Sequence, residues 1–204
     1  MRHHVIFLLC VCLSVCAALT GCGRKETVRQ TFDSGLLRDG DLLLRCGYGI
    51  ESSAVSMVSG SSYSHIGIAC HDSACGWMVV HAVPGESGPE GIDRLKYEPV
   101  DSFFSVTRTR NGAVARVLCD DDLKRVVVEY AVGKYRDGVL FDHDYVLEDS
   151  VEMYCAELVW RSFRAAGVPL VSSPSRRNPL GRKGMVIYPS DFLSDTLVSE
   201  IVSF

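Results

Sequence analysis

The sequence lacks features that mark several large functional classes. It has no dense run of basic residues and a formal net charge of −4, so a nucleic-acid-binding protein is not expected. No C-x-x-C or H-x-x-x-H spacing occurs, which argues against a zinc site, and we expect neither metal nor cofactor. No internal repeat is visible. The 204 residues therefore suit one domain of ordinary size with a short leader.

Long apolar runs are also missing, apart from one near the N-terminus. The stretch from Val5 to Leu19 follows a short basic start and precedes "LTGC". It is too short for a comfortable membrane span, and its layout predicts a secretory signal over residues 1–21.

The "LTGC" ending resembles the lipobox of bacterial lipoproteins. The resemblance implies that Cys22 carries lipid and that residues 22–38 tether a domain of residues 39–204 to a membrane. Several acyl chains on one residue would anchor the chain stably. The implied location is the periplasmic side of the cell envelope, at the outer membrane. An ordinary signal peptide that happens to end near a cysteine is the alternative.

Cysteine is plentiful, with nine copies. Three leave with the predicted signal and a fourth carries the lipid. Five remain in an oxidising compartment: Cys46, Cys70, Cys75, Cys119 and Cys155. An odd number leaves at least one thiol unpaired, and that thiol is a candidate for reactivity.

The mature part alternates short apolar runs with amphipathic stretches, which indicates one α+β domain. Strands are expected within 39–47, 63–70, 77–83 and 113–118, the second and third forming a hairpin. Residues 50–60 and 91–104 are expected to hold short helices, the latter with a loop. Longer helices are expected from about 120 to 133 and over 152–167. The C-terminal tail is expected to hold one last strand and a turn.

The stretch "EMYCAELVWRSFRAAG" (152–167) puts Cys155 just inside the start of its helix. A thiol attacks as thiolate, and a helix N-terminus or a nearby imidazolium can lower its pKa by several units. Asp149 and Ser150 are candidates for the N-cap, and Glu152 is placed to complete a capping box. A buried, inert cysteine is the alternative interpretation.

A base for this thiol is available on the predicted hairpin. If His65 lies opposite His81 across a loop of about three residues, both imidazoles share one face. One ring can then act as general base toward Cys155 while the other fixes its tautomer. A direct Cys70–Cys75 disulfide would shift the register by one residue and separate the rings, so we favour the shared face.

In chain order, "GDLLL", "YSHIGI", "VVHA", "FDHDY" and "MYCAELVW" resemble the circularly permuted papain-like amidases of the YiiX/YaeF type, relatives of the NlpC/P60 hydrolases. The resemblance runs from about Asp41 to Pro189. It implies an α+β fold in which an antiparallel sheet packs against the cysteine-bearing helix, with the histidine strand first. By position, Cys155 corresponds to the nucleophile and His65 to the base. His81 falls at the third polar position, where many members have glutamate.

The activity that the resemblance implies is hydrolysis of an amide bond through an acyl-enzyme, in a peptidoglycan-derived peptide or another amidated or acylated small molecule. The backbone N–H of Cys155 and the hydroxyl of Tyr48 are candidate oxyanion donors. Asp142 is a candidate for shaping the substrate cleft, and an ordinary turn carboxylate is equally open. Two other functions remain: a lipid acyl hydrolase or acyltransferase similar to lecithin:retinol acyltransferase, and a binding lipoprotein without catalysis.

Overall fold

The computed structural model describes residues 33–86, 91–147, 151–172, 174, 176–177 and 184–204. Within them, one six-stranded antiparallel sheet has the order β4-β3-β2-β1-β5-β8. Its strands are β1 (Leu42–Cys46), β2 (His65–Asp72), β3 (Gly76–Ala82), β4 (Leu95–Pro99), β5 (Asn111–Val117) and β8 (Val198–Ser203). A separate pair joins β6 (Arg176–Arg177) to β7 (Met185–Val186).

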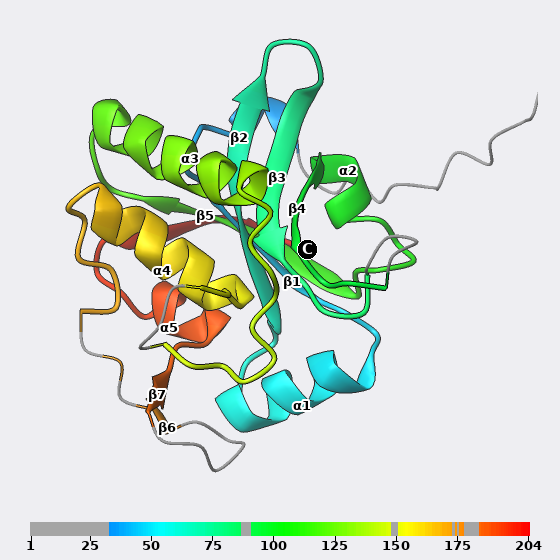
Figure 1. Cartoon of the computed structure of the whole chain (residues 1–204). Helices are drawn as coiled ribbons and strands as arrows, with labels where there is room; N and C mark the ends of the chain where they lie inside the picture. The colour runs from blue at the N-terminus through cyan, green and yellow to red at the C-terminus, as the bar shows by residue number, and fades with distance from the viewer. Residues whose placement is uncertain (1–32, 87–90, 148–150, 173, 175, 178–183) are drawn as a thin grey trace, which may run out of the picture.

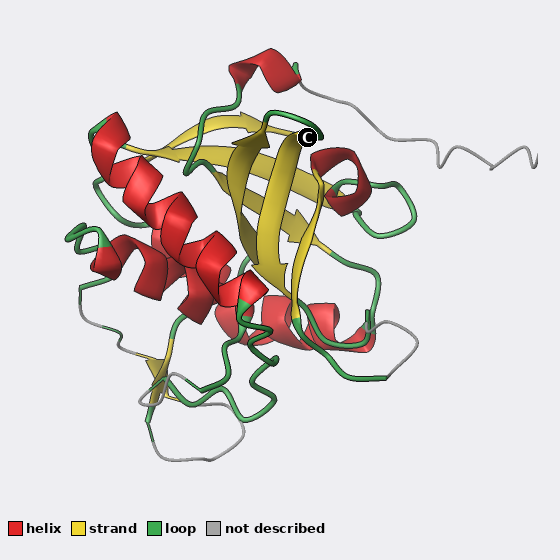
Figure 2. Ribbon diagram, turned by 45° about the horizontal axis from the view of Figure 1, so that its top comes forward, coloured by secondary structure: helices red, strands yellow, loops and turns green. Residues whose placement is uncertain are grey.

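The helices flank this sheet. They are η1 (Ser34–Leu36), α1 (Ile50–Ser59), α2 (Val100–Phe103), α3 (Asp121–Arg136), α4 (Cys155–Ala165) and α5 (Pro189–Leu193). Figures 1 and 2 show α3 and α4 together against the sheet, while α1 lies beyond the end where β1 finishes. The expected α+β fold, with an antiparallel sheet packed against the cysteine-bearing helix, is confirmed.

The sheet is buried on both faces, which explains the uninterrupted apolar run in β1. Leu42 and Leu44 belong to the large core that includes α3 and α4. Leu43 points the other way and packs with Phe103 of α2 and Val79 of β3 in a smaller core. Because successive side chains of a strand alternate between faces, β1 carries apolar residues at the consecutive positions 42–44, before the buried Arg45.

The β2–β3 hairpin has the predicted shared face with a different register. His81 lies opposite Gly67, not opposite His65, so the pairing is shifted by two residues and each side chain keeps its face. Asp72 Oδ1 accepts hydrogen bonds from the backbone N–H groups of Ala74 (2.8 Å) and Cys75 (2.9 Å), and this turn sets the register.

Cys70 and Cys75 are both free thiols, which agrees with the expected absence of a hairpin disulfide. Within the described residues, each of the five mature cysteines is unpaired, so the odd count alone does not single out Cys155.

Several local predictions were wrong. The helix expected over 152–167 begins only at Cys155, with Tyr154 as N-cap and no side-chain capping bond. Glu152 lies before the helix and bridges Leu140, so it closes no capping box. Asp149 and Ser150 lie outside the described residues. The segment 91–104, for which a loop and a short helix are expected, contains a full edge strand, β4.

The folded domain also begins earlier than residue 39. Leu37 is 4% exposed and packs in the smaller core, so residues 34–38 belong to the domain and not to a free tether. The predicted signal and Cys22 lie outside the described residues. Among the described helices, none has the length and apolar character needed to cross a bilayer.

Candidate active site

A pocket of about 500 Å³ opens at the end of the sheet where α1 lies. Its lining comes from the end of β1 with α1, the start of β2, the loop after β3, residues 107–108, Phe141 and Tyr145, the N-terminal end of α4, and residues 186–189. Its walls are mostly apolar, and several polar side chains reach into it, among them Arg45, Ser64, His65, Glu86 and Cys155. This combination of an apolar cavity and few converging polar groups is typical of a small-molecule site.

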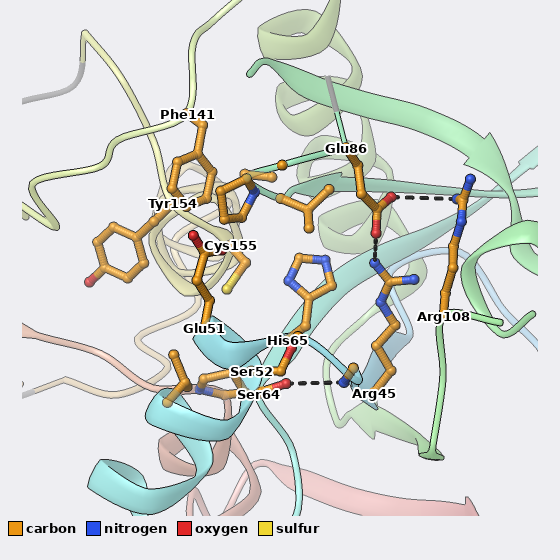
Figure 3. A pocket seen from close by; sticks show the side chains of 18 of the residues that line it. Arg45, Glu51, Ser52, Ser64, His65, Glu86, Arg108, Phe141, Tyr154 and Cys155 are labelled. Atoms are coloured by element: carbon orange, nitrogen blue, oxygen red, sulfur yellow. Dashed lines mark hydrogen bonds and ion pairs between the residues drawn. The ribbon is translucent and has the colours of Figure 1, made fainter. Parts of the chain in front are cut away.

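Cys155 is the first residue of α4, and its partly buried thiol lines this pocket. In Figure 3 its sulfur faces the imidazole of His65, with a ring nitrogen of His65 on the near side. The first N–H groups of a helix have no partner within the helix, so the start of α4 presents amide donors to the same space. The predicted meeting of Cys155 and His65 at one pocket is thus present.

His81, the third predicted catalytic residue, contacts His65 on the side away from Cys155. His65 Nε2 and His81 Nδ1 are 2.8 Å apart, and both rings are buried. Phe103 of α2 contacts both rings, at centroid distances of 5.6 and 5.1 Å, and fixes their planes. His65 lines the pocket, whereas His81 lies one layer deeper and reaches the cavity only through His65.

Sequence reasoning missed the next residue in this chain of contacts. Glu98 of β4 places Oε1 3.1 Å from His81 Nε2. Strand pairing between Val79 and Glu98 brings the carboxylate beside His81. Alternation in "LKYEP" was the available signal, because Lys96 and Glu98 share one face of a five-residue strand.

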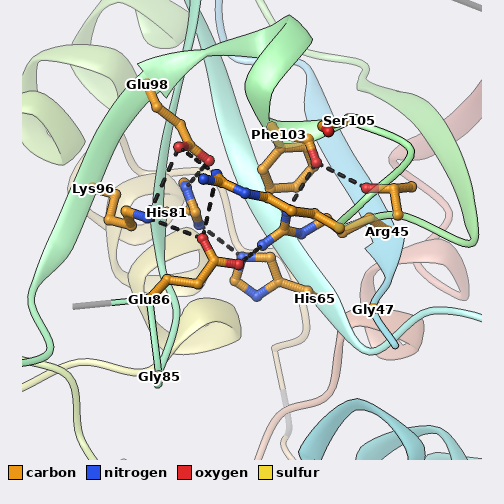
Figure 4. Close-up of polar contacts among 12 residues, drawn as sticks. Arg45, Gly47, His65, His81, Gly85, Glu86, Lys96, Glu98, Phe103 and Ser105 are labelled. Atoms are coloured by element: carbon orange, nitrogen blue, oxygen red, sulfur yellow. Dashed lines mark hydrogen bonds and ion pairs between the residues drawn. The ribbon is translucent and has the colours of Figure 1, made fainter. Parts of the chain in front are cut away.

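Three cations surround this carboxylate and its neighbour Glu86. Arg108 lies 2.9 Å from Glu98 Oε2 and 3.5 Å from Glu86 Oε2, and Lys96 lies 2.9 Å from Glu86 Oε2. Arg45, 3% exposed, donates to Glu86 Oε1 at 2.8 Å and to the carbonyl of Phe103 at 2.8 Å. Figure 4 shows these contacts as one network beside the histidine pair.

The thiol is not acidified in this structure, contrary to the expectation from its helix position. Burial raises the pKa of the Cys155 thiol to about 11. The backbone amides of Ile66 and Ala156 and the charge of Arg45 act in the opposite direction without overcoming burial. Cys155 therefore rests as a thiol near neutral pH.

Both imidazoles rest neutral for a related reason. Burial lowers the pKa of His65 well below its usual value, and the positive charge of Arg45 lowers it further. Burial also lowers the pKa of His81, although the hydrogen bond to Glu98 partly offsets this. For Glu98, burial alone would raise the pKa, but His81, Lys96 and Arg108 hold it at about 2. Of Cys155, His65, His81 and Glu98, only the Glu98 side chain is therefore charged at rest.

The other two predicted site residues, Tyr48 and Asp142, are engaged in contacts away from the thiol. Tyr48 lines the pocket but is 55% exposed, and its hydroxyl donates to the carbonyl of Thr109 at 3.3 Å, which does not support an oxyanion role. Asp142 is buried and accepts hydrogen bonds from the backbone N–H groups of Asp144, Tyr145 and Val146.

Asp142 acts on the cleft only indirectly. Its bonds hold the loop in which Tyr145 adopts φ +54°, a left-handed conformation that is uncommon outside glycine. Tyr145 lines the pocket, so the turn carboxylate shapes the wall without touching the cavity.

Gly67 keeps the space that His81 needs. A Cβ added at Gly67 would lie 2.6 Å from Val79 Cγ2 and 3.0 Å from His81 Cβ. The glycine of "SHIGI" is thus required by the close approach of β3, and its φ is not positive.

Known proteins share this architecture. The chain matches, over residues 36–180, the model of the permuted papain-like amidase enzymes, the YaeF/YiiX or C92 family. A solved structure, described as metalloprotein yiiX from Escherichia coli O157:H7, superposes with a TM-score of 0.59 at 17% identity. The superposition covers 81% of this chain and 96% of that one, which shows a shared fold. A comparison with curated protein sequences finds no match.

The description of that neighbour as a metalloprotein raises the question of a metal here. Among the described residues, no group of three or more histidine, cysteine, aspartate or glutamate side chains is arranged to hold a metal ion. His65 and His81 are hydrogen-bonded to one another, and Glu98 is bound to His81 and Arg108, so the donors of this site face each other. The part of the chain that the structure describes therefore offers no set of side chains that fits a metal.

The family model spans well over half of the chain and includes the strand of His65 and the helix of Cys155. That family consists of papain-like cysteine hydrolases of the amidase type, and this chain belongs to it.

Proposed function

We propose that this protein hydrolyses an amide bond in a small peptidoglycan-derived or similar amidated molecule, with Cys155 as nucleophile and His65 as base. One observation carries the proposal: a ring nitrogen of His65 faces the Cys155 sulfur inside a pocket of about 500 Å³. His81 orients the base from behind through the 2.8 Å contact. A pocket of this size suits a small acyl group or a short peptide better than a folded protein.

In the first half of the reaction, the Cys155 sulfur attacks the carbonyl carbon of the amide. A C–S bond forms as the thiol proton passes to His65 Nδ1, and negative charge develops on the carbonyl oxygen. The imidazolium then gives the proton to the amide nitrogen, the C–N bond breaks, and an amine leaves. The product is a thioester on Cys155.

In the second half, water attacks the thioester. His65 takes a proton from the water, the C–S bond breaks, and the proton returns to the sulfur as the acid leaves. The backbone N–H of Cys155 at the start of α4 is the candidate donor to both oxyanions. One such donor contributes about 100- to 1,000-fold to the rate.

The resting protonation state decides how the nucleophile is activated. A thiol with a pKa of about 11 beside a neutral imidazole is not a preformed ion pair. Proton transfer to His65 must accompany the attack, as in general-base catalysis, which contributes about 100- to 10,000-fold. A sluggish resting thiol is therefore compatible with an active enzyme.

A second candidate, a lipid acyl hydrolase or acyltransferase, is favoured by the rim of the pocket. Ile50 is 90% exposed and Tyr48 is 55% exposed, and both line the cavity mouth. An acyl chain leaving the pocket would cover these side chains. The amide substrate remains the first choice because the family is one of amidases.

Incubation with a muropeptide mixture and, separately, with phospholipid vesicles tests the proposal. Mass spectrometry of the products should show muropeptides cleaved with the gain of one water, and Cys155→Ala should abolish the cleavage. Free fatty acid from the vesicles alone would replace the first candidate by the second. No product from either substrate, together with ligand binding that Cys155→Ala leaves unchanged, would make the protein a binding lipoprotein.

The anchor is tested separately from the chemistry. Cys22→Ser should move the protein from the membrane fraction to the soluble fraction and prevent incorporation of labelled palmitate. An unchanged distribution of the variant would contradict lipidation while leaving the hydrolase proposal intact.

A further inference from the structure

Glu98 is held so that each of its oxygens has a separate partner. Oε1 lies 3.1 Å from His81 Nε2, and Oε2 lies 2.9 Å from Arg108 and 3.9 Å from Lys96. Its side chain is 13% exposed, and it does not line the pocket. Glu98 can therefore act on a substrate only indirectly, through the two histidines or through Arg108, which lines the pocket.

The carboxylate determines where the protons of both rings lie. An ionised carboxylate only accepts hydrogen bonds, so His81 Nε2 must carry a hydrogen. The neutral His81 ring then has a lone pair on Nδ1, and this atom must accept from His65 Nε2–H across 2.8 Å. The remaining nitrogen of His65, Nδ1, is left with its lone pair on the side of Cys155.

We propose that Glu98 is a positioning residue of the catalytic site, which sets both histidine tautomers so that His65 Nδ1 faces Cys155 as a base. This inference rests on the proposed function and extends its machinery from three residues to four. Relatives expected to have glutamate in place of His81 would put the carboxylate next to the base. In this chain the carboxylate is one imidazole further away.

Glu98 also stabilises the charge that appears during the reaction. When the thiol proton reaches His65 Nδ1, the ring becomes an imidazolium whose Nε2–H still points at His81. The carboxylate beyond His81 favours this positive charge without accepting a proton itself. Charge stabilisation of this kind is what an orienting carboxylate supplies in hydrolases with a histidine base.

Glu86 provides a matched comparison. It contacts the same cations, Lys96 and Arg108, and also Arg45, but it makes no contact with His81. The charged and titratable groups around the histidine pair come from five segments: Arg45 of β1, Glu86 after β3, Lys96 and Glu98 of β4, Arg108 before β5, and Cys155 of α4.

The test is the tautomeric state of the imidazoles, read from long-range 1H–15N spectra of the histidine-labelled mature protein, which keeps four of the six histidines once residues 1–21 are removed. Signals of the surface residues are identified by His71→Asn and His143→Asn. In the wild-type protein, His65 and His81 should both carry hydrogen on Nε2. Glu98→Gln should give mixed tautomers at His81, because an amide can donate as well as accept. Glu86→Gln should leave both tautomers as in the wild type.

Kinetics supply a second measurement once a cleaved substrate is known. Glu98→Gln should lower kcat about 10- to 100-fold through His65. A higher KM with kcat unchanged would instead point to Arg108, which Glu98 also contacts at the pocket, and would contradict the proposal. Loss of the carboxylate disfavours the imidazolium, so the acid limb of the kcat–pH profile should move to lower pH. A purely structural role would lower the amount of folded enzyme without moving this limb.

A wild-type His81 with its hydrogen on Nδ1 would overturn the proposal even if Glu98→Gln failed to fold. Unchanged His81 tautomer and imidazole pKa values in a folded Glu98→Gln variant would overturn it as well. The predicted tautomers without turnover of any amide would instead contradict the proposed hydrolase function and leave the positioning role standing.

Discussion

Two free thiols in this molecule share a raised pKa, but only one is placed to act as a nucleophile. Cys155 at the start of α4 and Cys70 within β2 are both free, and burial raises their pKa values, to about 11 and about 12. Cys70 is packed in the large core, and its polar neighbours are the Tyr97 hydroxyl and the carboxylates of Asp39 and Asp72. Cys155 has an imidazole facing it and backbone amides beside it.

The comparison indicates that resting acidity does not separate a nucleophile from an inert thiol here. What separates them is a base that can take the proton at the moment of attack and donors that meet the resulting charge. Cys70 has no imidazole beside it: the Tyr97 hydroxyl favours its thiolate, but burial and the carboxylates of Asp39 and Asp72 raise its pKa. Each prediction below changes one side of this comparison.

The largest expected difference lies in turnover. Cys155→Ala should reduce amide hydrolysis about 10⁵- to 10⁶-fold, because the acyl-enzyme cannot form. Cys70→Ala, which removes a core thiol that has no imidazole beside it, should leave the rate per folded molecule within about twofold. Both are measured by product formation at matched concentrations of folded protein. Equal loss in the two variants would refute the assignment of the nucleophile.

The next largest effect concerns the ring behind the base. His81→Asn should lower kcat about 10- to 100-fold, because His65 keeps its place but loses the partner that fixes its tautomer. The control is His71→Asn on the same hairpin, because the His71 side chain is exposed and its ring only meets Trp77 edge to face. The test is the steady-state kinetics of both variants. An inactive His71→Asn would contradict a specific role of His81 in holding His65.

A smaller effect is expected in alkylation by iodoacetamide. Below its pKa of about 11, the thiolate fraction of Cys155 rises about tenfold per pH unit, so its alkylation rate should rise steeply between pH 7 and 10. His65→Ala should slow labelling of Cys155 without affecting Cys70. Mass spectrometry of peptides resolves the sites, with the exposed Cys75 as the fast internal reference. A plateau for Cys155 already at pH 7 would instead indicate a preformed ion pair.

The smallest effect is on stability. Cys70 is 2% exposed in the core, so Cys70→Ala should lower the free energy of unfolding by about 1–2 kcal/mol through lost contacts. Cys155→Ala should cost less, because its side chain lies partly exposed in the pocket. Urea unfolding monitored by circular dichroism gives both values, and the reverse order would contradict the packing described above.

Much of the fold could be predicted from residue patterns because they are local. Short apolar runs identified β2 and β3. The alternation of side chains along these strands correctly put His65 and His81 on one face, although His81 pairs with Gly67 and not with His65. A register shift of two residues leaves each side chain on the same face, because the side-chain period of a strand is two residues. The position of the turn depends on Asp72 and its bonds to the backbone, which the pattern does not reveal.

The parts that could not be predicted depend on long-range contacts. β4 is a five-residue edge strand containing two charged residues, and only its pairing with β3 makes it a strand. Glu98 gains its place through that pairing, so sequence reasoning stopped at His81. Tyr48 was chosen for its aromatic hydroxyl, and its actual partner, the carbonyl of Thr109, is 61 residues away in sequence.

The glycine opposite His81 limits how this family member can diverge. Even a methyl group at position 67 would collide with Val79 and press on the backbone side of His81. In a saturation library selected for turnover, this position should remain glycine while its strand neighbours accept other apolar residues. An engineer who wishes to change what the pocket accepts should therefore alter α1 and the loop of Tyr145, and leave the hairpin alone.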